Sequence, residues 1–435
     1  MHIRKQYKTP HKSDLLTLDT TNKLIKYLLS IKYIFKTPSG TIDIKYRKIN
    51  IENTIYNKCF KTKYTHNTFA KLYETTKISI SSKNIKDIIQ EYTDEWKEII
   101  LQLLQSSFTS YIIIQYFENC CDTLYSILFD NIKIMICYNN KEYTTENIND
   151  IVYHLYNIIK FIECAVLKQE NRIQIIIILS PFEKTFCYSS IIPFITKYSW
   201  LEWINTMDDI DKTTMSPFNI NTGYSYHVKN EGKIVIYRID ELYKVYIHEI
   251  THNIDLHIHT ENLLVKHNDI FKFYLGDNNY PLLINEAYTE FITLILWNYY
   301  LILFHSTQIN NIEYTTISLL QHMLNQELYN SKLVCNLYFN YLNVDNLNIF
   351  LKPNNINQNT NGFSYIFIKY IFLLHINQFQ SLVPNKHSIL IINTIISDLL
   401  IDISLNKYNY LCISPLNVID ICKYKFKLSF YKLML

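Results

Sequence analysis

The spacing of apolar residues predicts helices in the first part of the chain and a buried strand after them. Apolar positions recur at helical spacing over residues 95–130 and again over 144–170. The run QIIIIL (174–179) is short and rich in β-branched residues, and it ends at Ser180-Pro181. A run of this length with such a stop signal is typical of a buried strand.

A hairpin and two helices are predicted in the centre of the chain. The runs YSYHV and KIVIYRI flank the turn KNEG, which predicts a β-hairpin over residues 224–239. Asp240 is a suitable N-cap for the next segment, ELYKVYIHEITHNIDLHIH, whose apolar stripe at helical spacing predicts a helix. Pro281 suits the first turn of another helix, PLLINEAYTEFITLILWNYYLILF. The pattern over residues 306–435 is mostly helical.

The first of these central helices carries residues suited to bind a metal. His248 and His252 are the histidines of an HExxH motif, and residues four apart share one face of a helix. Both imidazoles can therefore bind one ion, which we expect to be Zn²⁺. Glu249 can reach a water on that ion without being a ligand. Because the ion lowers the pKa of this water, Glu249 can accept its proton as the general base.

The second central helix offers the missing ligand. A catalytic zinc site typically has three protein ligands and one open position. Glu286 and Glu290 are four residues apart in a strongly apolar helix, where two carboxylates need a cation or hydrogen bonds to offset burial. We expect Glu286 to bind the metal and Glu290 to hold a ligand histidine from behind, which fixes its tautomer.

Three residues after the motif are alternative third ligands. They are Asp255, His257 and His259. On a straight helix His259 lies too far along to meet the ion bound by His252, and Asp255 is better placed for a supporting contact one turn below His252. The metzincin pattern is excluded, because its glycine and third histidine are absent from this stretch.

The order of these residues resembles the gluzincin branch of the zinc metallopeptidases, in which HExxH is followed by a Glu on a later helix. The strings HEITHNID and NEAYTE resemble lethal-factor-like catalytic domains, and NINTG…YRIDELYKVYIHEITHNIDL is similar to metallopeptidase-like proteins of large DNA viruses. The resemblance covers roughly residues 174–300 and implies a mixed sheet over the motif helix, with substrate along an edge strand. Such enzymes also use a Tyr or His donor for the oxyanion, for which Tyr280 is the first choice and Tyr288 the second.

Composition narrows the class of protein further. A net charge of +3 is too weak and too scattered to predict nucleic-acid binding. Nine cysteines with no CxxC predict a reducing compartment, with neither a disulfide framework nor a cysteine zinc site. The N-terminal residues lack the apolar core of a signal peptide, and the longest apolar stretches are too short and too polar to span a membrane. The abundance of Ile, Asn, Lys and Tyr is typical of an AT-rich genome, as in many large DNA viruses. We expect an intracellular, cytoplasmic protein, which would lie in host cytoplasm or the virion if its source is viral.

Together these observations predict an α+β fold with a zincin-like catalytic core at residues 171–305, in which a small mixed sheet packs on the HExxH helix. A mostly helical N-terminal region, 1–170, precedes it, and a helical C-terminal region, 306–435, completes the core. The predicted function is a zinc-dependent metallopeptidase that acts on a peptide or protein substrate. The alternative is a non-catalytic metal-binding or assembly protein that retains the fold. No pattern in the chain indicates an oligomeric state.

Overall fold

In the described part of the chain, six short strands form one mixed sheet, and successive side chains along each strand point to opposite faces of it. The computed structural model describes residues 16–47, 94–106, 108–109, 111–166, 172–182, 184, 221–228, 231–254, 256, 258, 283–306, 313–341, 362 and 364–404. The sheet has the order β1-β2-β3-β4-β6-β5, with parallel pairs β3–β4 and β4–β6 and antiparallel pairs elsewhere. The strands are β1 (Thr41–Tyr46), β2 (Thr123–Phe129), β3 (Ile132–Tyr138), β4 (Ile173–Ile178), β5 (Gly223–Val228) and β6 (Glu231–Ile236).

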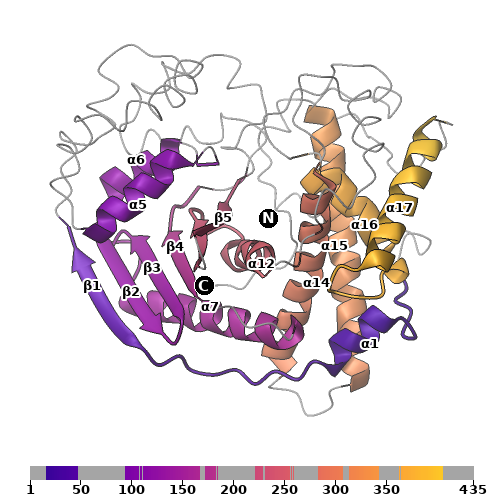
Figure 1. Ribbon diagram of the computed structural model, residues 1–435, viewed down its shortest axis with the longest axis horizontal. Coiled ribbons are helices and arrows are strands. Elements are labelled where there is room, and N and C mark those ends of the chain that lie inside the picture. The colour runs from indigo at the N-terminus through magenta and orange to yellow at the C-terminus, as the bar shows by residue number, and fades with distance from the viewer. Residues whose placement is uncertain are drawn as a thin grey trace, which may run out of the picture.

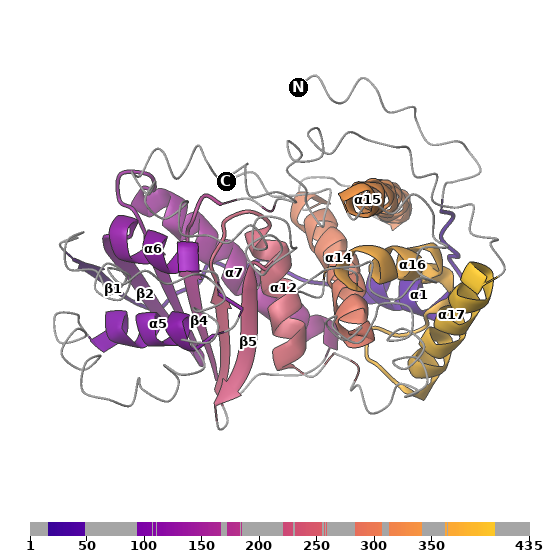
Figure 2. The ribbon, with the colours of Figure 1, turned by 90° about the horizontal axis from the view of Figure 1, so that it is seen from above.

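Helices cover both faces of this sheet (Figures 1 and 2). On β3, Met135 and Cys137 face a core shared with α5 (Asp94–Gln105) and α6 (Tyr111–Cys120). The alternate residues Ile134 and Ile136 face the larger core, which is shared with α7 (Thr145–Val166) and α12 (Leu242–Asn253). Burial on both faces explains why β3 and β4 are almost continuously apolar.

A helical layer packs on the far side of α12. Its central member, α14, contacts α12, α15, α16 and the π-helix η7. Among the described residues only α14 is long and apolar enough to cross a membrane, and 89% of its most apolar stretch is buried inside the fold. Helices α15, α16, α17 and α1 lie on the side of α14 away from α12 (Figure 2). The layer consists of α14 (Ile284–Ser306), α15 (Glu313–Tyr341), η7 (Ser364–Ile368), α16 (Lys369–Leu374), the 3₁₀ turn η8 (Ile376–Gln378), α17 (Lys386–Ser404) and α1 (Lys23–Ser30).

Several predicted elements are confirmed. The buried strand is β4, the hairpin over 224–239 is β5–β6, and the helix over 144–170 is α7. The helix that contains Glu286 is α14, and the described part of 306–435 is mainly helical. These elements had the longest or most regular patterns, so their type followed from periodicity alone.

The expected helices over 95–130 are wrong at the C-terminal end of that range, where Thr123–Phe129 form strand β2. Helix α6 ends at Cys120, and β2 and β3 then form a hairpin through Asp130, whose φ is 50°. The runs TLYSILF and IKIMICY are mostly apolar, and IKIMICY is buried along almost its whole length. Their period of two is therefore hidden, and helical spacing fits them equally well. Because β3 pairs with β4, the sheet crosses the expected boundary at residue 170.

Helix α12 lies at the centre of the molecule. Each of its residues except His252 is buried. It contacts β5, β6, α7 and α14. Close approach to β6 requires Gly232, because a Cβ there would collide with the side chain of Asn253. The amide of Asn253 in turn donates to the Glu249 carbonyl at 3.0 Å. The C-terminal turn of the HExxH helix is thereby fixed against the sheet.

The N-terminus of α12 differs from the predicted cap. Glu241, not Asp240, is the N-cap residue, and its side chain makes no capping hydrogen bond. Its backbone is left-handed, with φ 59°, which is unfavourable for a residue with a Cβ. The carboxylate instead pairs with Lys184 at 2.7 Å, and this buried contact replaces the cap.

Candidate metal centre

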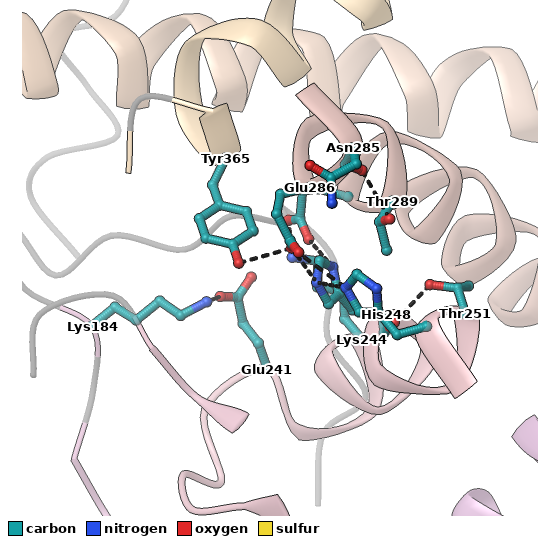
Figure 3. Close-up of polar contacts among 11 residues, drawn as sticks. Lys184, Glu241, Lys244, His248, Thr251, Asn285, Glu286, Thr289 and Tyr365 are labelled. Atoms are coloured by element: carbon teal, nitrogen blue, oxygen red, sulfur yellow. Dashed lines mark hydrogen bonds and ion pairs between the residues drawn. The ribbon is translucent and has the colours of Figure 1, made fainter. Parts of the chain in front are cut away.

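Two helices bring three ligand atoms together. The Nε2 atoms of His248 and His252 are 3.2 Å apart. Glu286 Oε2 lies 3.3 Å from His248 Nε2 and 3.4 Å from His252 Nε2. Figure 3 shows the Glu286 carboxylate reaching from α14 to the imidazoles of α12. The three atoms therefore form a nearly equilateral triangle.

The edges of this triangle can be compared with the spacing of ligands around a small metal ion. Tetrahedral ligands at about 2.0–2.1 Å from an ion are separated by about 3.3–3.4 Å, whereas octahedral ligands at that distance are separated by about 2.8–3.0 Å. The observed edges of 3.2, 3.3 and 3.4 Å fit the tetrahedral case. The His248, His252 and Glu286 group can accordingly hold a metal ion.

Burial shows that these side chains are not a polar surface face. The side chains of His248, His252 and Glu286 are 8%, 20% and 15% exposed, and that of Glu290 is 2% exposed. Glu249 is also buried. The partial exposure of His252 and Glu286 leaves one approach to the triangle open, while the other ligand sits inside the core.

A second carboxylate orients His248 from behind. Glu290 Oε2 lies 3.0 Å from His248 Nδ1, so Nδ1 carries the proton and Nε2 faces the triangle. Lys244, one helical turn before His248, contacts the other oxygen of Glu290. Burial alone would raise the pKa of Glu290, but Lys244, His248 and Lys369 outweigh it and lower that pKa. Glu290 is therefore held as an anion.

The electrostatic surroundings of His248 and Glu286 favour positive charge on the imidazoles and negative charge on the carboxylate. Burial opposes protonation of His248, but its hydrogen bonds to Glu286 and Glu290 raise the pKa of His248 to about 10. Burial also acts against the Glu286 anion, yet His252 and His248 lower the pKa of Glu286 well below its ordinary value. The carboxylates thus favour a positive charge on the side of the imidazoles. A bound metal ion would supply that charge in place of the proton on His248.

Glu249 has the environment of a base. It follows His248 on α12, lines the cavity beside the triangle and is buried. Burial raises the pKa of Glu249, and the nearby His248 and His252 offset only part of that increase. A carboxylate with a raised pKa takes up a proton more readily than an exposed one.

Tyr365 is a site residue that the sequence argument missed. It belongs to the π-helix η7, and its hydroxyl donates to Glu286 Oε2 at 3.0 Å (Figure 3). Its ring lies edge-on to the His248 ring, with centroids 5.9 Å apart. Burial and the neighbouring Glu286 and Glu249 raise the pKa of Tyr365 well above 10, so it remains a donor. Only the irregular helix hints at a function, since π-helical turns are frequent at functional sites.

The two expected oxyanion donors are not part of the described site. Tyr288 packs among Phe291 and Phe379 in the helical layer, with centroids 6.2 and 6.0 Å away, so the second choice is wrong. Helical rotation explains this, because a residue two positions after Glu286 points to another side of α14. The first choice, Tyr280, lies outside the described residues.

The expected supporting residue and the other alternative ligands also lie outside the described part of the chain. They are Asp255, His257 and His259. The third corner of the triangle is an oxygen of Glu286.

Comparisons with known proteins give no assignment for this arrangement. No protein-family profile, curated protein or solved structure matches the chain. The candidate function therefore depends on the geometry and chemistry of the site itself.

Proposed function

We propose that the protein is a zinc-dependent metallopeptidase with a zincin-like core. The tetrahedral spacing of His248 Nε2, His252 Nε2 and Glu286 Oε2 is the observation that carries this proposal. Two imidazoles and one carboxylate suit zinc, and a third protein ligand with an open fourth position is typical of catalytic zinc. When bound there, zinc supplies Lewis-acid chemistry, which polarises a carbonyl and makes water more acidic.

Glu249 has the general-base role in this proposal. Its carboxylate accepts a proton from the water that attacks the scissile carbonyl carbon, and it then delivers a proton to the leaving amine as the C–N bond breaks. Glu290 and Lys244 keep His248 in the tautomer whose Nε2 faces the ligand triangle. The raised pKa of Glu249 supports the base role.

Tyr365 is proposed as the donor to the developing oxyanion. Its hydroxyl is 3.0 Å from a ligand oxygen of Glu286, so a carbonyl oxygen in the open position would lie within reach of this donor. The edge strand β5 runs beside α12 and has one unpaired edge among the described strands. An extended peptide laid along β5 would present its carbonyls to this position.

The proposal is tested first through the metal. We expect purified wild-type protein to hold about one zinc per chain by plasma mass spectrometry and to cleave members of a peptide library. Chelator treatment should abolish cleavage, and added Zn²⁺ should restore it. Protein without stoichiometric zinc would overturn the proposal. Stoichiometric zinc without cleavage of any peptide would instead favour a non-catalytic metal-binding protein.

Replacement of Tyr365 by Phe should slow hydrolysis without loss of the metal. We expect kcat/KM for a cleaved peptide to fall roughly 10²–10³-fold, because one oxyanion donor is lost while the ring is kept. Zinc content should be unchanged, because Tyr365 contacts a ligand but is not one. Tyr288→Phe is the matched control, since Tyr288 packs in the helical layer. Equal losses in both variants would exclude the specific role of Tyr365.

A further inference from the structure

A small polar cavity lies beside His248 and Glu249, between the start of β5 and the N-terminal half of α12. Its volume is about 40 Å³. One water needs about 10–15 Å³ of such volume, so the cavity has room for about three heavy atoms. Most of the residues that line it have polar side chains, among them Lys184, Asn221, Thr222, Lys244 and Tyr365. The cavity therefore suits a small polar group and excludes a long apolar side chain.

Each of the two lysines in the wall has more hydrogen-bond donors than its ion pair uses. Lys184 and Lys244 are each 2% exposed, which is unusual for lysine. Within the described part of the chain, Lys184 contacts one carboxylate, Glu241, and Lys244 contacts one, Glu290. An ammonium group has three donors and no acceptor, so each lysine has donors beyond its ion pair. A ligand in the cavity would need to be rich in acceptors.

Thr222 adds an independent observation. It is 4% exposed, and its hydroxyl has no hydrogen-bond partner among the described residues. A buried hydroxyl without a partner destabilises the fold, and valine has the same shape without this penalty. Thr222 is also one of the residues that line the cavity beside the two lysines. A ligand that accepts a hydrogen bond would satisfy it.

The strained N-terminus of α12 keeps Lys184 in place. Glu241 adopts φ 59° and directs its carboxylate to Lys184 at 2.7 Å rather than to the helix backbone (Figure 3). Strain of this kind persists only where the surroundings determine it, and it is concentrated at functional sites. The pair holds the Lys184 ammonium at the cavity wall, where a long lysine side chain would otherwise extend into water.

Two carboxylates, Glu249 and Glu290, line the cavity and affect where a negatively charged ligand can bind. Glu290 is paired with Lys244 and His248. Glu249 lies beside the metal ligands, next to His248 in the chain, and would repel an anion at that end. Lys184 and Thr222 also line the cavity, and they belong to segments 65 and 27 positions before Glu249. We therefore assign a bound carboxylate to Lys184 and Thr222 rather than to the residues beside Glu249.

We propose that this cavity binds a carboxylate of the peptide substrate next to the bond that is cleaved. The carboxylate belongs either to an Asp or Glu side chain or to the C-terminus of the substrate. This inference rests on the proposed peptidase function and adds the substrate class. Lys184 and Thr222 are the specificity-determining residues, and Lys244 contributes charge from its place beside Glu290.

Matched peptides test the substrate class. One peptide has Asp beside the cleaved bond and an amidated C-terminus, the second has Asn in place of Asp, and the third has Asn with a free C-terminus close to the bond. We expect the carboxylate-bearing peptide to exceed the doubly neutral peptide roughly 10²-fold in kcat/KM. Higher kcat/KM for the Asp peptide than for the doubly neutral peptide would identify a side-chain carboxylate as the ligand, and higher kcat/KM for the third peptide would identify the C-terminus. Equal kcat/KM for all three would overturn the inference.

Three variants connect this preference to the cavity. Thr222→Val should lower the carboxylate preference about tenfold, while Thr222→Ser keeps the hydroxyl and the preference. Lys184→Met would leave Glu241 buried and unpaired, so it is made together with Glu241→Gln. The double variant should reduce the preference to about onefold. An unchanged preference in Thr222→Val and in the double variant would overturn the inference.

A binding measurement decides the inference even if no peptide is cleaved. Succinate and its neutral analogue succinamide are titrated calorimetrically into zinc-loaded wild type and Thr222→Val. Both proteins retain all three metal ligands, so any difference between them reports on the cavity. We expect wild type to bind succinate about tenfold more tightly than Thr222→Val, with no such difference for succinamide. Equal succinate affinity in both proteins would exclude the carboxylate site, and the peptidase proposal would be judged separately by its metal and cleavage assays.

Discussion

Replacement of Glu249 by Gln should reduce kcat/KM for peptide hydrolysis roughly 10²–10⁴-fold, because the general base is removed while the shape of its side chain is kept. Glu249 is buried beside His248 and His252, and burial already raises its pKa. A neutral amide is therefore tolerated at this position. Zinc content and thermal stability should remain close to those of wild type.

The control for this variant is Glu98→Gln, which neutralises a carboxylate in a partly exposed ion pair with Lys233. It should retain wild-type kcat/KM, since exposed ion pairs contribute little. Initial rates are compared on one peptide at several substrate concentrations, with zinc measured in the same samples. A zinc-loaded Glu249→Gln protein with undiminished activity would show that another group is the base.

Replacement of Glu286 by Ala should weaken zinc binding roughly 10²–10³-fold. Four-ligand zinc sites have apparent binding free energies of about 10–16 kcal/mol, so one ligand accounts for roughly a quarter of that. The loss should be this large because Glu286 Oε2 is within 3.4 Å of both histidine Nε2 atoms. Competition with a chromophoric chelator gives the dissociation constants.

A graded control distinguishes a ligand from its support. Glu290→Gln should weaken zinc binding by about 10–100-fold, because Glu290 orients His248 without being a ligand. Normal zinc affinity in Glu286→Ala would exclude Glu286 as the third ligand. The ligand would then be sought at Asp255 or His259.

The grouping of the candidate metal ligands could be predicted from the sequence because each of its parts has a local signal. His248 and His252 share a helix face by their spacing, and Glu286 and Glu290 interrupt a helix that is otherwise apolar. The cost of burying two carboxylates indicated that a cation or hydrogen bonds lay nearby. Lys244 and the histidines are that compensation.

Tyr365 and the carboxylate cavity had no comparable signal. Tyr365 is separated from Glu286 by 79 positions and is one of 37 tyrosines, so only the tertiary fold selects it. Lys184 and Glu241 are 57 positions apart, and their pairing depends on the left-handed backbone of Glu241. The β2–β3 hairpin, in contrast, had a usable signal: two β-rich runs joined by Asp130-Asn131.

The origin of Tyr365 in the C-terminal half has a consequence for synthesis. A ribosome adds about 5–20 residues per second, so the 79 residues between Glu286 and Tyr365 take roughly 4–16 s to make. During that interval the emerging chain has its HExxH helix and third ligand but no Tyr365. On the proposed assignment, a nascent chain acquires its metal ligands before its full hydrolytic capacity, which delays cleavage of neighbouring proteins until the helical layer has been made.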